Sequence, residues 1–138
     1  MGVGPNRGIS KGFIAGGITA YVLGLIGEVT AEATVNLALT PNVLTPLVVV
    51  QEDMTAIRLT ATPGKIVINC AITGIARVTA GAAVAIGDRV TNDATARAVT
   101  RVRAIAGAQP AACIGIALTA AAAAGTQIDV LLQPGLTY

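Results

Sequence analysis

The residue types that most often perform catalysis are scarce in this sequence and form no catalytic group. The sequence has no histidine, which is the commonest general base, and Ser10 is its only serine. The spacing of Gly81 and Gly87 is similar to that in a phosphate-binding loop, but Asp88-Arg89 follows where that loop requires Lys-Ser/Thr. The adjacent pair Glu52-Asp53 is best explained as a solvated turn. The sequence therefore predicts neither an enzyme nor a bound cofactor.

Metal binding is not indicated either. Asp88, Asn92 and Asp93 indicate a turn, because a calcium loop needs more oxygen ligands at closer spacing. Cys70 and Cys113 lie in apolar, strand-like segments, and two cysteines without histidine cannot form an ordinary zinc site. We expect two buried free thiols, although a disulfide between them stays possible.

Five basic side chains are the candidate contact residues: Arg7, Lys11, Arg97, Arg101 and Arg103. The last three share one face of the alternating segment 96–105, which has two interpretations. It is a strand edge protected by charge, or a contact surface for an acidic protein neighbour. The net charge of +2 argues against nucleic acid as the partner.

The overall composition is strongly apolar, with 54% hydrophobic residues and 12% charged residues. The charged fraction is about half of the ordinary ~25%. Such a chain is too hydrophobic for disorder, and none of its apolar runs reaches the ~18–20 residues of a membrane-spanning helix. We expect part of its surface to be buried in an assembly.

Apolar residues recur mainly with period two, which is typical of β-strands. Leu47–Val50 is a continuous apolar run, as in a strand buried on both faces. Ala56–Thr62 alternates, and Ile66, Ile68, Cys70 and Ile72 share one face. Only Thr119–Ala124, with five alanines before Gly125, predicts a short helical link.

A weak internal repeat divides the chain. Ala15-Gly16 is matched by Ala80-Gly81, and the strand after Gly64 is matched by the strand after Gly125. We therefore predict an all-β fold, a small barrel or sandwich of two similar modules, within a single domain 1–138. The modules would span residues 12–74 and 75–135, after an extended N-terminal arm over residues 1–11.

The N-terminal region also permits a second interpretation. Arg7 and Lys11 precede an uncharged run, Gly12–Gly27, and Ala31-Glu32-Ala33 has the form of a signal-peptide cleavage site. Five glycines in that run disfavour a signal helix, so a buried strand or arm is the preferred interpretation. The alternative is a secreted or surface β-rich module that binds a ligand.

The second module resembles a known protein family. Its segments RVTAGAAVAIGDRVTNDATARAVT and ACIGIALTAAAAAGTQIDVLLQPG are similar to the small capsid decoration, or cement, proteins of tailed bacteriophages. The resemblance covers Lys11–Gly135, with no clear match over Asn36–Thr60. It implies a non-enzymatic protein on the outer surface of the virion. It also implies binding to the major capsid protein, often as a homotrimer, with no role for nucleic acid, membrane or cofactor.

Overall fold

The computed structural model describes residues 8–102 and 111–137, and in these residues nearly all regular structure is β. The described strands are β1 (Ser10–Ala15), β2 (Ile26–Ala31), β3 (Thr34–Leu37), β4 (Leu47–Val50), β5 (Val67–Ala71), β6 (Gly74–Thr79), β7 (Arg89–Asn92), β8 (Ala98–Thr100), β9 (Ala111–Ala117) and β10 (Gln127–Thr137). One short helix, α1 (Ala56–Ala61), joins β4 to β5. The all-β prediction is confirmed.

Strands β1–β5 form the first unit, a closed barrel with the order β1-β3-β2-β4-β5. Only β1 and β3 pair in parallel, and the other neighbours are antiparallel. The predicted alternation in β5 is confirmed, because Ile68 and Cys70 face the barrel core while Val67 and Asn69 are exposed. All four residues of β4 are buried, as its apolar run predicted.

Strands β6–β10 form the second unit, a sheet with the order β6-β10-β9-β7-β8. A parallel bridge between Ala80 and Ala98 joins its two ends, so the sheet curls toward closure. When the strands of each unit are numbered one to five along the chain, both units have the same circular order, 1-3-2-4-5. In both, only strands one and three are parallel neighbours. The prediction of two similar β modules is therefore confirmed.

The connections repeat as well. Tyr21 bridges Met54 in the first unit, and Val84 bridges Ala121 at the corresponding place in the second. Gly24 and Gly87 precede β2 and β7 with φ of 91° and 89°, a region that glycine enters without steric penalty. The repeat is thus a repeat of backbone geometry, even though few side chains are shared.

The helix does not lie where the alanines predicted it. Ala56–Ala61 is helical because Thr55 caps it, its side-chain oxygen accepting from Arg58 N at 3.3 Å, and because Leu59 is buried. The strand predicted over Ala56–Thr62 is therefore wrong. The helix predicted over Thr119–Ala124 is also wrong, since Ala121 exchanges two backbone hydrogen bonds with Val84 and so is held extended.

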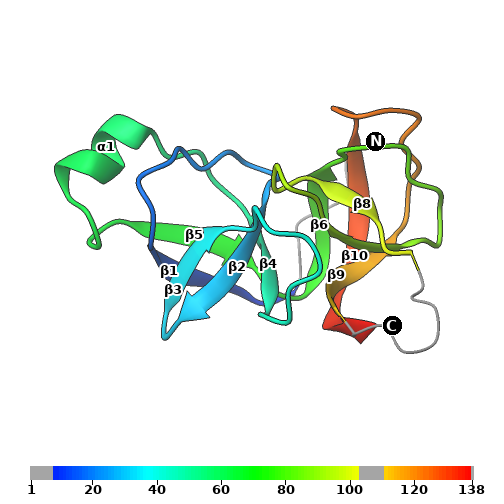
Figure 1. Ribbon diagram of the computed structural model, residues 1–138, viewed down its shortest axis with the longest axis horizontal. Helices are drawn as coiled ribbons and strands as arrows, with labels where there is room; N and C mark the ends of the chain where they lie inside the picture. The colour runs from blue at the N-terminus through cyan, green and yellow to red at the C-terminus, as the bar shows by residue number, and fades with distance from the viewer. Residues whose placement is uncertain (1–7, 103–110, 138) are drawn as a thin grey trace.

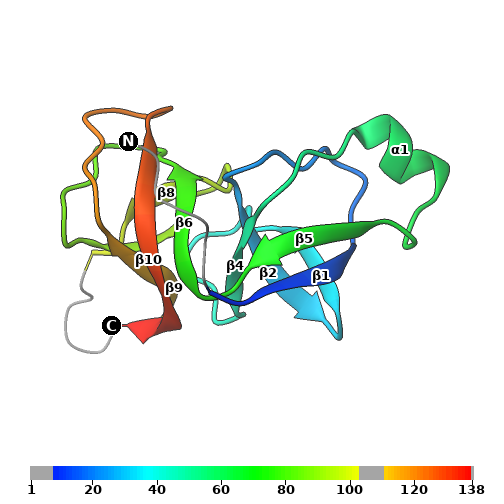
Figure 2. The same ribbon diagram turned by 180° about the vertical axis from the view of Figure 1, so that it is seen from behind.

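The two units lie side by side along the long axis of the molecule, with α1 at the end of the barrel away from the second unit (Figures 1 and 2). One hydrophobic cluster fills the barrel interior. The other fills the second unit and continues across the junction to Ile26, Leu47, Val49 and Ala71 of the barrel. Backbone hydrogen bonds also cross the junction, from Ile26 N to Ala96 O and from Ala112 N to Val43 O, both 2.7 Å. The units therefore share a core.

Residues 1–7 of the predicted N-terminal arm lie outside the described residues. Ser10 and Lys11, the last part of that arm, belong to β1 and pair with Ala71 and Cys70. Before them, Gly8 lies so close to Thr73 that a Cβ on Gly8 would overlap the Thr73 carbonyl. The chain thus enters the barrel next to the start of β6.

Candidate functional site

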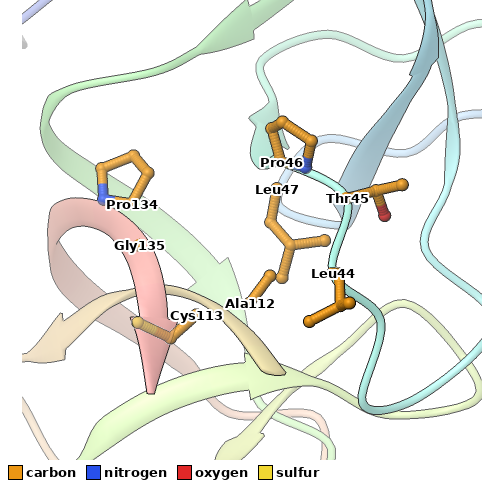
Figure 3. A pocket seen from close by; sticks show the side chains of 8 residues that line it. All are labelled: Leu44, Thr45, Pro46, Leu47, Ala112, Cys113, Pro134 and Gly135. Atoms are coloured by element: carbon orange, nitrogen blue, oxygen red, sulfur yellow. The ribbon is translucent and has the colours of Figure 1, made fainter. Parts of the chain in front are cut away.

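An apolar pocket of about 290 Å³ lies at the junction between the two units. Its wall from the first unit is the end of the β3–β4 connection, with Leu44 and Pro46, followed by Leu47 of β4. Ala112 and Cys113 of β9 and Pro134 of β10 form the wall from the second unit (Figure 3). Leu44 is largely exposed at its rim. The pocket can accept an apolar side chain, and the Thr45 hydroxyl in its wall donates to Glu28 Oε2 at 2.6 Å.

A second, more polar pocket of about 380 Å³ adjoins the same junction. Asn92 in its wall is buried, and its amide nitrogen donates to the carbonyl oxygens of Ala38 and Thr40 at 2.8 and 3.0 Å. Arg101 reaches across to Asn42, with Nη1 2.6 Å from Oδ1. Both contacts fasten the β3–β4 connection of the first unit to the second unit, so they fix the relative position of the units.

Asp93 organises the turn between β7 and β8. Its Oδ1 accepts from Thr95 N, Thr95 Oγ1 and Arg97 N at 2.7, 2.8 and 3.0 Å. Burial opposes the charge on Asp93, but these hydrogen bonds outweigh it and hold the pKa of Asp93 below 3.8, its ordinary value. Asp93 Oδ2 also occupies the space that a Cβ on Gly81 would need. The carboxylate is therefore a structural acceptor.

We predict that this turn makes the protein sensitive to acid. The pKa of Asp93 is lowered on folding, so its charge stabilises the fold above the unfolded-state pKa, and this stabilisation is lost as pH falls through the folded-state value. Asp93→Asn keeps an acceptor oxygen but removes the titration. Its melting temperature should fall less than that of the wild type between pH 5 and pH 2, measured by circular dichroism. Parallel pH profiles would contradict this role.

Cys70 is poorly suited to thiolate chemistry, and both cysteines are buried. Cys70 and Cys113 are buried and free, so the question of a disulfide is answered: the structure has none between them. Burial, with a smaller effect from Glu52, raises the pKa of Cys70 to about 12. Across the described parts of the chain, no three His, Cys, Asp or Glu side chains gather into a metal site.

The residues Gly8–Gly12 match the pattern Gly-x-Ser-x-Gly, which in some hydrolases presents a nucleophilic serine. That role needs a sharp turn between a strand and a helix, with a base beside the serine. Ser10 instead begins β1, paired in register with Ala71. We therefore assign no catalytic role to it.

Comparison with known proteins decides the family. A model of the phage cement protein family matches residues 28–132, which is most of the chain. The chain belongs to this family. It is accordingly a structural protein of the phage head, a component of the virion on the capsid exterior.

A solved structure agrees with this at the level of the fold. The N base of the head fiber gp8.5 of bacteriophage phi29 is similar with a TM-score of 0.58 and 16% sequence identity. The similarity covers 91% of this chain and 93% of that chain. No curated protein sequence matches significantly. Among the described residues of this head protein, no helix has the length and hydrophobicity to span a bilayer.

The predicted contact residues of this head protein are dispersed. Lys11 is on β1 of the barrel, with Nζ 5.3 Å from the centroid of the Phe13 ring. Arg97 and Arg101 flank β8 in the second unit, and Arg7 and Arg103 lie outside the described residues. The strand predicted over 96–105 is confirmed only over Ala98–Thr100 in its described part, and Ala96, with a φ of 62°, lies in the turn before it.

Sequence reasoning missed the residues that join the two units. Asn92 was interpreted only as part of a turn, yet its amide crosses the junction. The sequence could not predict that Leu44 and Pro134 line one pocket, because they are far apart in the chain. The one available clue was the apolar excess of the composition, which indicates that surface is buried but not where.

Proposed function

We propose that the chain is a cement protein that binds the outer surface of the assembled capsid, bridges neighbouring major capsid subunits and thereby stabilises the head. The family match over residues 28–132 carries this proposal. The fold supports it, because two equivalent units joined by a shared core form a rigid body with a fixed spacing between their surfaces.

The surface is also suited to protein contact. Several large apolar side chains are more than half exposed on both units, among them Ile9, Leu44 and Ile86. Such side chains are available for burial against another protein. We further propose that the chain forms a homotrimer, which would bury part of this surface, and that Arg7, Lys11, Arg97, Arg101 and Arg103 contribute contacts to the capsid or to sister subunits.

The alternative of a secreted ligand-binding module is less well supported. Cleavage after Ala33 would remove β1 and β2, and with them Phe13, Ala15, Tyr21 and Ile26 of the two cores. The uncharged run Gly12–Gly27 therefore supplies strands and core residues of the barrel. With three aromatic residues in the whole sequence, the chain also has little material for stacking on sugars.

The proposal predicts a loss of head stability when the protein is missing. Filled heads that lack it should release DNA at a lower temperature than decorated heads, and adding the purified protein should restore the wild-type temperature. DNA release can be followed with a dye during heating, and cryo-electron microscopy shows whether the protein is bound outside. Equal release temperatures with full decoration would rule out stabilisation, and absence from the capsid would rule out the proposal as a whole.

A further inference from the structure

The internal repeat allows the outer surfaces of the two units to be compared position by position. In the first unit, Ile26, Val49 and Ala71 are cross-strand neighbours on β2, β4 and β5. All three are fully buried, and they belong to the cluster that crosses the junction rather than to the barrel interior. This row is therefore the outer face with which the first unit packs on the second.

The second unit has an equivalent row. Ile75, Leu131, Ile116 and Arg89 are successive cross-strand neighbours on β6, β10, β9 and β7, here called the outer row. Arg89 takes the place of Ile26, Ile116 that of Val49, and Leu131 that of Ala71. Figure 2 shows β6 and β10 side by side on the second unit.

The outer row is more exposed than the equivalent row of the first unit, which packs on the second unit. Ile75, Ile116 and Leu131 are only half-buried, and Arg89 is exposed. None of the three apolar residues belongs to either hydrophobic cluster of the described chain. Leu118, also exposed, extends the apolar surface along β9. Three branched apolar side chains in one cross-strand row are typical of a sheet face that packs on another protein.

Charge limits the possible partner. Arg77 beside the outer row pairs with Asp129 at 3.3 Å, whereas Arg89 has no ion pair among the described residues. The face therefore carries an excess positive charge next to apolar side chains. A second copy that covered the outer row with apolar residues, as the row of Ile26 is covered, would bury Arg89 without a counter-ion. A partner that offers an apolar patch and a carboxylate suits the face better.

We propose that the outer row docks on the major capsid protein, against an apolar patch that is bordered by an acidic side chain. This inference rests on the proposed function and adds to it a surface and the chemistry of its partner. Ile116 lies at the centre of the contact, where apolar interface residues contribute most to affinity, and Arg89 lies at its edge. Arg89 should accordingly make binding sensitive to salt.

Binding of the purified full-length chain to phage heads assembled without it tests the inference. Ile116→Lys and Arg89→Glu should each raise the dissociation constant about tenfold or more in cosedimentation. Matched controls are Ile57→Lys and Arg58→Glu on α1, an apolar and a basic exposed residue at the far end of the barrel, which should bind within about twofold of the wild type. Arg89→Glu should also abolish most of the salt dependence.

The possible outcomes are distinct. Wild-type affinity in both outer-row variants, or loss of binding only in the α1 variants, would overturn the inference. Normal head binding combined with an altered sedimentation coefficient of the free protein would assign the outer row to contacts between copies, and would overturn it too. If the wild-type protein itself failed to bind heads, the proposed function would fail as well. Arg89 is exposed, so Arg89→Glu keeps the test independent of folding.

Discussion

Replacing Ile26 with arginine should destabilise the protein by about 3–5 kcal/mol, the range expected for a buried charge that has no partner. Ile26 is fully buried at the junction, in a cross-strand row with the apolar Val49 and Ala71 and within an apolar cluster. The guanidinium would have to remain desolvated or separate the two units. Urea unfolding followed by circular dichroism measures the change.

The reciprocal variant, Arg89→Ile, provides the matched control. Arg89 has the same place in the second unit but is exposed, so its substitution should change stability by no more than about 0.5 kcal/mol. Ile26→Arg and Arg89→Ile thus exchange the same two residue types at equivalent positions, but their expected effects on stability are very different. A loss below about 1 kcal/mol for Ile26→Arg would contradict the shared core, because an exposed position tolerates such a change.

Part of the fold could be predicted from local features of the sequence. Alternation identified the buried face of β5, and the matching glycines Gly64 and Gly125, both with positive φ, identified the two modules. These signals are local, because side-chain direction and backbone conformation depend on a few neighbouring residues. Period two and turn glycines therefore carried the all-β prediction without knowledge of the strand order.

The two wrong assignments have a common physical cause. Alanine propensity favoured a helix over Thr119–Ala124, but the pairing of Ala121 with Val84, far away in the sequence, outweighs a preference of a few tenths of a kcal/mol per residue. In Ala56–Thr62 the alternation was incidental, and the cap from Thr55 with the burial of Leu59 selects the helix. Tertiary pairing and capping decide such short segments.

The candidate surfaces could not be predicted from the sequence, because they too depend on tertiary pairing. The outer row joins Ile75 to Leu131 and Ile116 to Arg89, so it exists only once the register of four strands is known. Arg97 and Arg101 were predicted to lie within one longer strand, whereas the structure places them directly before and directly after β8.

Gly115→Ala should have the other large effect, a loss of about 3 kcal/mol or more. Gly115 of β9 lies opposite Leu132, where the register of β10 shifts before Gly135. A Cβ on Gly115 would overlap the Leu131 carbonyl and lie 2.9 Å from Gln133 N. Both atoms belong to the backbone of the neighbouring strand, so neither can move without breaking the pairing of β9 with β10. Thermal and urea unfolding would measure the loss.

Gly135→Ala on β10 separates this steric effect from a general intolerance of larger residues in the same strand pair. Nothing lies within 4 Å of a Cβ at Gly135, so its substitution should change stability by no more than about 0.5 kcal/mol. If both variants were equally stable, the close approach of β9 and β10 at Gly115 would be refuted. If only Gly115→Ala lost stability, the irregularity at Leu132–Gly135 would be the place where the second unit admits no side chain, and the register that aligns Leu131 with Ile116 in the outer row would depend on that glycine.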